Sequence, residues 1–244
     1  MSSATFGQAG YIFGGSGSTG GRVNTVYKYE IDSWTTMLNM TDRRSGATCG
    51  KSSDYAYVVG GDGDAASNEN FQYSVTGNSW ATKTDYPSPD TRIGCNQFSL
   101  NEDVYLFGGN NGSARQDDND LYDTSGDSWT SKASLPSLVF RHAAFTASGK
   151  GYSIAGVYTF SVSDNNEYDT DADSWSAKTD GYEAEGPSGI SRAKAGNMVS
   201  GRDITGTITF LDAHSEYKPA TDSWTSKEST LSPFRYLGAG MGPL

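Results

Sequence analysis

YLFGGNNGSARQDDNDLYDTSGDSW, residues 105–129, holds the pattern that decides the fold. An apolar run ends in two glycines, and Tyr122 then precedes Trp129 by seven residues. An aromatic and apolar run of this length is typical of a strand, and the glycines permit a tight turn with positive φ. The Asp-Ser pair directly before Trp129 favours a hairpin turn. The stretch therefore predicts a strand, a loop and a β-hairpin.

The same pattern recurs along the 244 residues of the chain. Successive tryptophans are 46, 49, 46 and 49 residues apart, and each ends a DSW or NSW tripeptide. The five tryptophans are Trp34, Trp80, Trp129, Trp175 and Trp224. Each follows a tyrosine, by five residues in the first copy and by seven in the others: Tyr29, Tyr73, Tyr122, Tyr168 and Tyr217. Internal repetition at this period indicates a solenoid, a propeller or an array of repeats.

Two further features recur in each copy. A glycine-ended apolar run lies upstream of each tyrosine: YIFGG (11–15), YVVGG (57–61), YLFGG (105–109), YSIAG (152–156) and a degenerate DITG (203–206). An arginine and a segment of small residues follow each tryptophan; the arginines are Arg44, Arg92, Arg141, Arg192 and Arg235. Each unit is interpreted as four strands: a, the small-residue segment; b, the glycine-ended run; c, the segment with the tyrosine; and d, the residues after the tryptophan.

A single four-stranded sheet cannot bury both of its faces, whereas stacking sheets around an axis buries them against one another. We therefore expect an all-β, five-bladed propeller, with four antiparallel strands per blade and each tryptophan packed between adjacent blades. The expected blades of this single domain, 1–244, are 1–40 plus 235–244, 41–88, 89–137, 138–186 and 187–234. Both termini would close one blade, with SATFG (3–7) and LGAGMG (237–242) competing for its innermost strand.

The combination of a double glycine, Y-x6-W and a following arginine resembles the kelch repeat, over about residues 3–242. Propellers of that family more often have six or seven blades, and this chain supplies five. The resemblance implies that partners bind at the mouth of the central channel, with arginines at the junction of strands d and a facing acidic peptides. All five recurring arginines are therefore candidate ligand-binding residues; the alternative is that each bonds carbonyls of the neighbouring blade.

A second candidate region is the loop over residues 179–192, which is about five residues longer than its counterparts. Long loops on a rigid scaffold often carry binding residues. Tyr182, Glu183 and Glu185 are therefore candidates for contact with a partner. An insertion without function is the equal alternative.

Composition limits the classes of function. The net charge of −11 argues against nucleic-acid partners. No apolar stretch is long enough to span a membrane and the N-terminus has no Sec-type signal, so we expect a soluble protein without membrane insertion. Cys49 and Cys95 occupy equivalent places in adjacent units, either as two buried thiols or as a bonded pair.

Catalytic and metal-binding patterns are weak. His142 and His214 are the only histidines, and no G-x-S-x-G motif accompanies them. DTDADS (169–174) imitates the start of an EF-hand loop but lacks the glycine and glutamate at the later positions. We therefore expect no catalytic residue, no metal and no cofactor.

The sequence favours a non-catalytic binding or structural module that recognises a protein or a cell-surface glycan through its loops and mouth. A phage or virion fibre, a decoration protein or an adhesin subunit is such a module; it would sit on a particle or extracellular surface and contact other subunits. The alternative is a small sugar-active enzyme, epimerase- or lyase-like, with a site at the propeller mouth. That site would need several converging polar side chains, with Arg92, Arg141 and His142 as the first to test.

Overall fold

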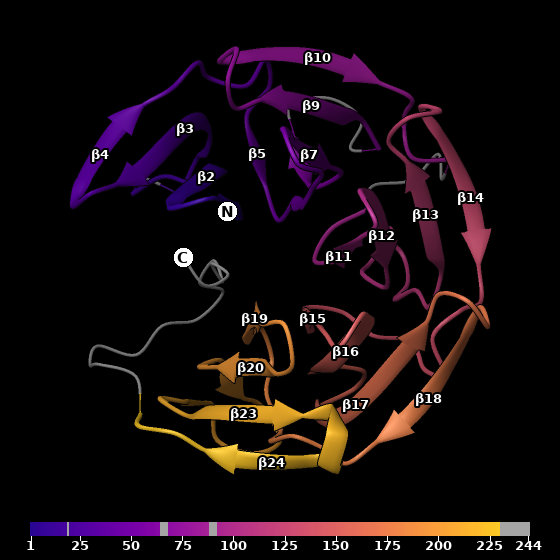
Figure 1. Cartoon of the computed structure of the whole chain (residues 1–244). Coiled ribbons are helices and arrows are strands. Elements are labelled where there is room, and N and C mark those ends of the chain that lie inside the picture. Colours follow the sequence, from indigo (N-terminus) through magenta and orange to yellow (C-terminus); the bar gives the residue numbers. More distant parts are fainter. Residues whose placement is uncertain (19, 64–67, 88–91, 230–244) are drawn as a thin grey trace.

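A computed structural model describes residues 1–18, 20–63, 68–87 and 92–229. The blades are arranged around a central axis, and the chain passes from one blade to the next in sequence order (Figure 1). Apart from one 3-10 turn, Pro219–Thr221, the regular structure of the described residues consists of strands. The prediction of an all-β propeller with five four-stranded antiparallel blades is confirmed.

Each blade is an antiparallel meander whose first strand lies nearest the axis. The first blade contains β1 (Ser2–Phe6), β2 (Ala9–Ser16), β3 (Arg22–Glu30) and β4 (Ser33–Thr36). The second contains β6 (Thr48–Lys51), β7 (Tyr55–Val59), β9 (Asn70–Ser74) and β10 (Ser79–Lys83). The third contains β11 (Asn96–Leu100), β12 (Asp103–Phe107), β13 (Asn119–Asp123) and β14 (Ser128–Lys132).

The last two blades follow the same order. The fourth contains β15 (Ala143–Ala147), β16 (Lys150–Val157), β17 (Ser161–Asp169) and β18 (Ser174–Lys178). The fifth contains β19 (Ser188–Ser191), β20 (Gly196–Val199), β23 (His214–Lys218) and β24 (Ser223–Ser226). Two small sheets pair β5 (Arg44–Ser45) with β8 (Asp62–Gly63) and β21 (Arg202–Asp203) with β22 (Thr209–Phe210).

The four strands of the first blade all come from residues 2–36. The SATFG segment therefore supplies the innermost strand, β1. The competing segment, LGAGMG (237–242), lies outside the described residues, as does the rest of 235–244. The blade boundaries given above, including the share of the C-terminus in the first blade, stay predictions.

The sequence interpretation of the fifth blade needs a correction. Its strand b is β20, which pairs with β19 and β23, whereas DITG (203–206) begins in the small β21 strand and continues into a turn. The counterpart of the glycine-ended run is NMVSG (197–201). Gly201 has a φ of 109°, close to the 95° of Gly109, and only glycine adopts this conformation readily. The run was missed because it has lost both its aromatic residue and its first glycine.

Each blade pairs its repeated tyrosine directly with its repeated tryptophan across the hairpin of strands c and d. In the fourth blade, the ring centroids of Tyr168 and Trp175 are 4.9 Å apart. The Tyr168 hydroxyl donates a 2.5 Å hydrogen bond to Asp173, which occupies the turn with a φ of 47°. The Asx residue of the turn is therefore fixed by the tyrosine of its own blade.

The same turn joins each blade to the one before it. Trp175 Nε1 donates to the Ala133 carbonyl at 2.8 Å, while Asp173 Oδ1 accepts from the Ala133 N–H at 2.8 Å. We call this two-point contact the Trp–Asx clamp. It recurs at Leu38 (Asn78 and Trp80), Thr84 (Asp127 and Trp129) and Thr179 (Asp222 and Trp224), with distances of 2.8–3.0 Å.

The clamps confirm the inter-blade role of tryptophan at four positions and correct it at the fifth. Trp34 is 55% exposed, and no described residue accepts a hydrogen bond from its indole. An aromatic ring of the preceding blade packs on the tryptophan in three of the four clamps: Phe13 on Trp80 at 5.8 Å, Tyr86 on Trp129 at 5.1 Å and Phe107 on Trp175 at 5.5 Å.

Cys49 and Cys95 are both free and buried, so they are two thiols and not a disulfide. Burial raises the pKa of both, that of Cys95 to about 11, which keeps the thiols protonated at neutral pH. Within the described ranges, no helix has the length and apolar character needed to cross a membrane.

Candidate binding channel

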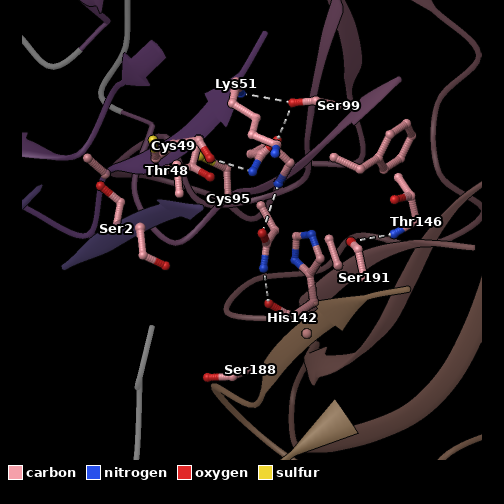
Figure 2. A pocket seen from close by; sticks show the side chains of 18 of the residues that line it. Ser2, Thr48, Cys49, Lys51, Cys95, Ser99, His142, Thr146, Ser188 and Ser191 are labelled. Atoms are coloured by element: carbon pink, nitrogen blue, oxygen red, sulfur yellow. Dashed lines mark hydrogen bonds between the residues drawn. The ribbon is translucent and has the colours of Figure 1, made fainter. Parts of the chain in front are cut away.

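The innermost strands β1, β6, β11, β15 and β19 surround a cavity of about 1230 Å³ on the propeller axis. Every blade contributes to its wall. Figure 2 shows small hydroxyl-bearing residues from several blades lining it: Ser2, Thr48, Ser99, Thr146, Ser188 and Ser191. This cavity is the channel that the sequence predicted at the centre of the blades.

Small side chains line the channel because five strands converge on one axis. At Gly189, in the fifth blade, a Cβ atom would lie 1.9 Å from the backbone oxygen of Ala144 in the fourth. Only glycine allows the two inner strands to approach this closely. The small-residue segment after each recurring arginine therefore has a packing cause as well as a consequence for the site.

The wall of the channel carries an excess of basic side chains. Lys51, Arg141 and Arg192 line it, and Asp62 is the one acidic side chain among its described lining residues. Asp62 is ion-paired with Arg22 at 2.6 Å. In a protein of net charge −11, the channel is therefore a locally basic region.

Hydrogen bonds between neighbouring blades hold the polar wall in place. Asn96 Nδ2 donates to the His142 carbonyl at 2.7 Å, and Gln97 Nε2 donates to the Cys49 carbonyl. The Lys51 N–H donates to Ser99 Oγ at 2.9 Å. Figure 2 shows these bonds running from one inner strand to the next. The wall is therefore preorganised, which lowers the cost of ordering side chains around a ligand.

His142 lies in this wall, 2% exposed, with its ring centroid 5.1 Å from that of Phe107. Neither ring nitrogen has a hydrogen-bond partner among the described residues. Burial lowers the pKa of His142 to about 3 because a charged imidazolium would be poorly solvated there. At neutral pH its imidazole is therefore uncharged.

Two of the predicted binding arginines do not reach the channel, and their candidacy is corrected here. Arg44 and Arg92 are each 1% exposed. Arg44 donates to the Gly60 carbonyl at 2.8 Å and pairs with Glu69. Arg92 donates to the Gly108 carbonyl at 3.2 Å and pairs with Asp118 at 2.8 Å. Both bond the glycine turn of their own blade, instead of the neighbouring blade, so their role is internal.

The other three predicted arginines differ in where they lie. Arg141 and Arg192 line the channel, while Arg235 lies outside the described residues. Arg141 pairs with Glu185 at 2.5 Å and lies over the Phe140 ring at 4.6 Å. Arg192 Nε donates to Asn197 Oδ1 at 2.9 Å. These two arginines are the candidates that remain at the mouth.

The three candidates of the 179–192 loop do not converge on one site. Glu185 is buried between Arg141 and Arg202, which lies 2.6 Å away. The Tyr182 hydroxyl donates to the Ser200 carbonyl at 3.0 Å, and burial raises the pKa of Tyr182. Glu183 is the exposed member. Glu185 and Tyr182 therefore hold the loop to the protein instead of facing a partner.

Sequence reasoning did not single out Lys51, Asn96 and Gln97 as channel residues. The available signal was their place in the small-residue segments already interpreted as the innermost strands. Within the described residues no group of three or more histidine, cysteine, aspartate or glutamate side chains could hold a metal ion.

Four-stranded blades around a polar channel define a β-propeller. Residues 98–136 match the family model described as the Kelch motif. The fold of the chain is similar to that in "Structure of YjhT", with a TM-score of 0.81, 16% sequence identity, and coverage of 98% of this chain and 86% of that one. At this identity the similarity concerns the fold alone. A search of curated proteins finds no match to the sequence.

Proposed function

We propose that this propeller is a non-catalytic binding module whose central channel binds a glycan. Kelch propellers are in general binding or structural modules. The observation that carries the finer proposal is the channel wall of hydroxyl and amide side chains, such as Thr48, Asn96 and Ser191. Such groups exchange hydrogen bonds with sugar hydroxyls, and a concave preformed site is where small ligands bind.

The basic side chains narrow the class of glycan. Lys51 and Arg192 would favour sugars that carry carboxylates, because guanidinium and ammonium groups form charge-assisted hydrogen bonds with them. A ligand that enters the channel therefore gains more from an acidic sugar than from a neutral one. Placement on a virion or cell surface, and assembly with other subunits, stays a prediction.

The test is a glycan array with the full chain, followed by calorimetry with the glycan that binds best. Arg192→Ala should weaken that binding about tenfold, since a hydrogen bond to a charged group contributes roughly 1.5–3 kcal/mol. Arg43→Ala is the matched control, because Arg43 is exposed and outside the channel wall. The proposal fails if no glycan binds, or if the two substitutions weaken binding equally.

The sugar-active enzyme is the alternative, and it rests on Arg141 and His142 in the channel wall. Arg92, the third residue expected there, lies inside a blade. With a pKa of about 3, His142 is an uncharged imidazole at neutral pH and so does not supply an imidazolium as general acid. We therefore expect a bound glycan to be recovered unchanged, as checked by NMR of the sugar after long incubation; a new product would favour the enzyme.

A further inference from the structure

The first blade has an aromatic face that nothing in the described part of the chain covers. It consists of Tyr27, Tyr29, Asp32 and Trp34, and we call it the first-blade face. Trp34 is 55% and Tyr27 39% exposed. The Trp34 ring lies 5.0 Å from that of Tyr29 and 6.4 Å from that of Tyr27. Monomeric proteins rarely expose such a cluster without an interaction that uses it.

This face already has the Asx and tryptophan side chains of a Trp–Asx clamp in place, without the residue that they would bond. The Tyr29 hydroxyl donates to Asp32 Oδ1 at 2.9 Å, as the corresponding tyrosines do in the other blades. Asp32 has a φ of 56°, against 44–50° for its four counterparts. The clamp therefore has its binding geometry before a ligand arrives.

The fifth blade does not fill this clamp. The residue that matches Leu38, Thr84, Ala133 and Thr179 in the repeat is Glu228, four residues after Trp224. Glu228 is exposed, and no hydrogen bond joins it to Asp32 or Trp34. In Figure 1 no described strand lies between β4 and β24. The clamp is therefore unoccupied among the described residues.

The fifth blade is also a poor match for the aromatic face. The first and third blades present Tyr11 and Phe13, or Tyr105 and Phe107, toward the next blade. In the fifth blade, β20 has Asn197 and Val199 at these places, as its pairing with β23 shows. Its β20 strand therefore lacks the aromatic side chains that the first and third blades pack on the tryptophan of the next blade.

The four occupied clamps define what the empty one accepts. Each holds the N–H and the C=O of one residue in an extended segment. That residue is neutral in every case: Leu38, Thr84, Ala133 and Thr179. In three of the four segments, a buried apolar residue follows two positions later: Met40, Tyr86 and Leu135.

We propose that the first-blade face binds an extended strand of a partner polypeptide, clamped by Asp32 and Trp34 at one neutral residue. We expect the sequence of the bound strand to be a neutral residue, a polar residue and then an apolar residue, as in three of the segments that the other clamps hold. A second copy of this chain would present the charged Glu228 at the clamped position, so we assign the face to a different polypeptide. This mode is main-chain recognition at a preformed sheet surface, with a side-chain pocket for specificity.

The test uses the full chain with 15N-labelled tryptophan indoles and a synthetic peptide, SWTSKASLPS, which repeats residues 128–137 of the sequence. Loss of one resonance in Trp34→Phe assigns the Trp34 indole. Titration with the peptide should move that resonance saturably. Asp32→Ala should weaken binding about tenfold, whereas Asp54→Ala, an exposed aspartate elsewhere, should not.

A second peptide with proline at the Ala133 position is the matched control, because it lacks the N–H that Asp32 accepts. The proposal is overturned if the parent peptide leaves the Trp34 resonance unmoved at millimolar concentration, or if both peptides move it equally. It is also overturned if the Trp34 indole is bonded in the free chain. A dimer in sedimentation would then assign the face to a second copy. Release of the indole on deletion of residues 230–244 would assign it to the chain itself.

Discussion

The joint between the third and fourth blades and the first-blade face are built from the same side chains, yet their environments differ. At the joint, Asp173 and Trp175 bond both main-chain groups of Ala133. At the first-blade face, Asp32 and Trp34 have the same local geometry and no such residue among those described. The comparison teaches that a blade positions the Asx and tryptophan side chains by itself, and that the preceding blade supplies the main-chain residue that they bond.

This division follows from the physics of repeat folds. The free energy of each repeat is a sum of its own stability and the terms at its interfaces with neighbours. The tyrosine, Asx residue and tryptophan act within one hairpin, whereas the hydrogen bonds of the clamp act between blades. Substitutions within the hairpin and substitutions at the contact between blades should therefore lower the free energy of unfolding by different amounts.

The largest effect is expected from removing a tryptophan of an occupied joint. Trp175→Ala should lower the free energy of unfolding by about 3 kcal/mol, the low end for a truncated tryptophan, because it removes a half-buried ring that packs on Phe107 and bonds the Ala133 carbonyl. Trp34→Ala removes an exposed ring and should cost about 1 kcal/mol or less. Chemical denaturation of both variants checks the difference; equal losses would break the comparison.

A smaller loss is expected at the axis side of the joint between the fourth and fifth blades. Glu185→Ala removes a buried carboxylate that pairs with Arg141 and Arg202. Both arginines are partly exposed, so we expect a loss of about 2–3 kcal/mol, toward the low end for broken buried pairs. Glu183→Ala, two residues earlier and exposed, should change the free energy of unfolding by less than about 0.5 kcal/mol.

Acid pH should distinguish the occupied clamps, because the Asx residue of one of them is Asn78, whose amide does not titrate. The Tyr168 hydroxyl and then the Ala133 N–H lower the pKa of Asp173. Its contribution is complete above the ordinary carboxyl pKa of about 3.9 and is lost as the pH falls through the lower, folded value. Asn78 holds Leu38 without a charge. Hydrogen exchange from about pH 4 downward should show falling protection at the Ala133 amide and steady protection at Leu38; parallel losses would contradict this.

The blades could be predicted from the sequence because their signals are local. Tyrosine and tryptophan seven residues apart face each other across one hairpin, so their spacing identified strands c and d in the last four blades. The strand b of the fifth blade was placed too late, at 203–206. Its segment, 197–201, keeps only the glycine that the turn requires.

The site could be predicted less well because it depends on contacts between distant residues. Arg92 and Arg141 both lie 12 residues after a repeated tryptophan, yet Arg92 precedes the bridge Ile93–Asn110 and Arg141 follows the equivalent bridge Phe140–Val157. Arg92 pairs with Asp118 within its own blade and is buried. Arg141 instead finds Glu185 from the following blade and lines the channel. Spacing alone does not say which carboxylate meets which arginine.

The most direct test of the account is hydrogen exchange at the five tryptophan indole N–H groups, followed by NMR of the full chain. The account predicts four slowly exchanging indoles, those of Trp80, Trp129, Trp175 and Trp224, and one rapidly exchanging indole, that of Trp34. Slow exchange at all five would show that the first-blade face is covered within the free protein. Rapid exchange at several would show that the Trp–Asx clamp does not join the blades.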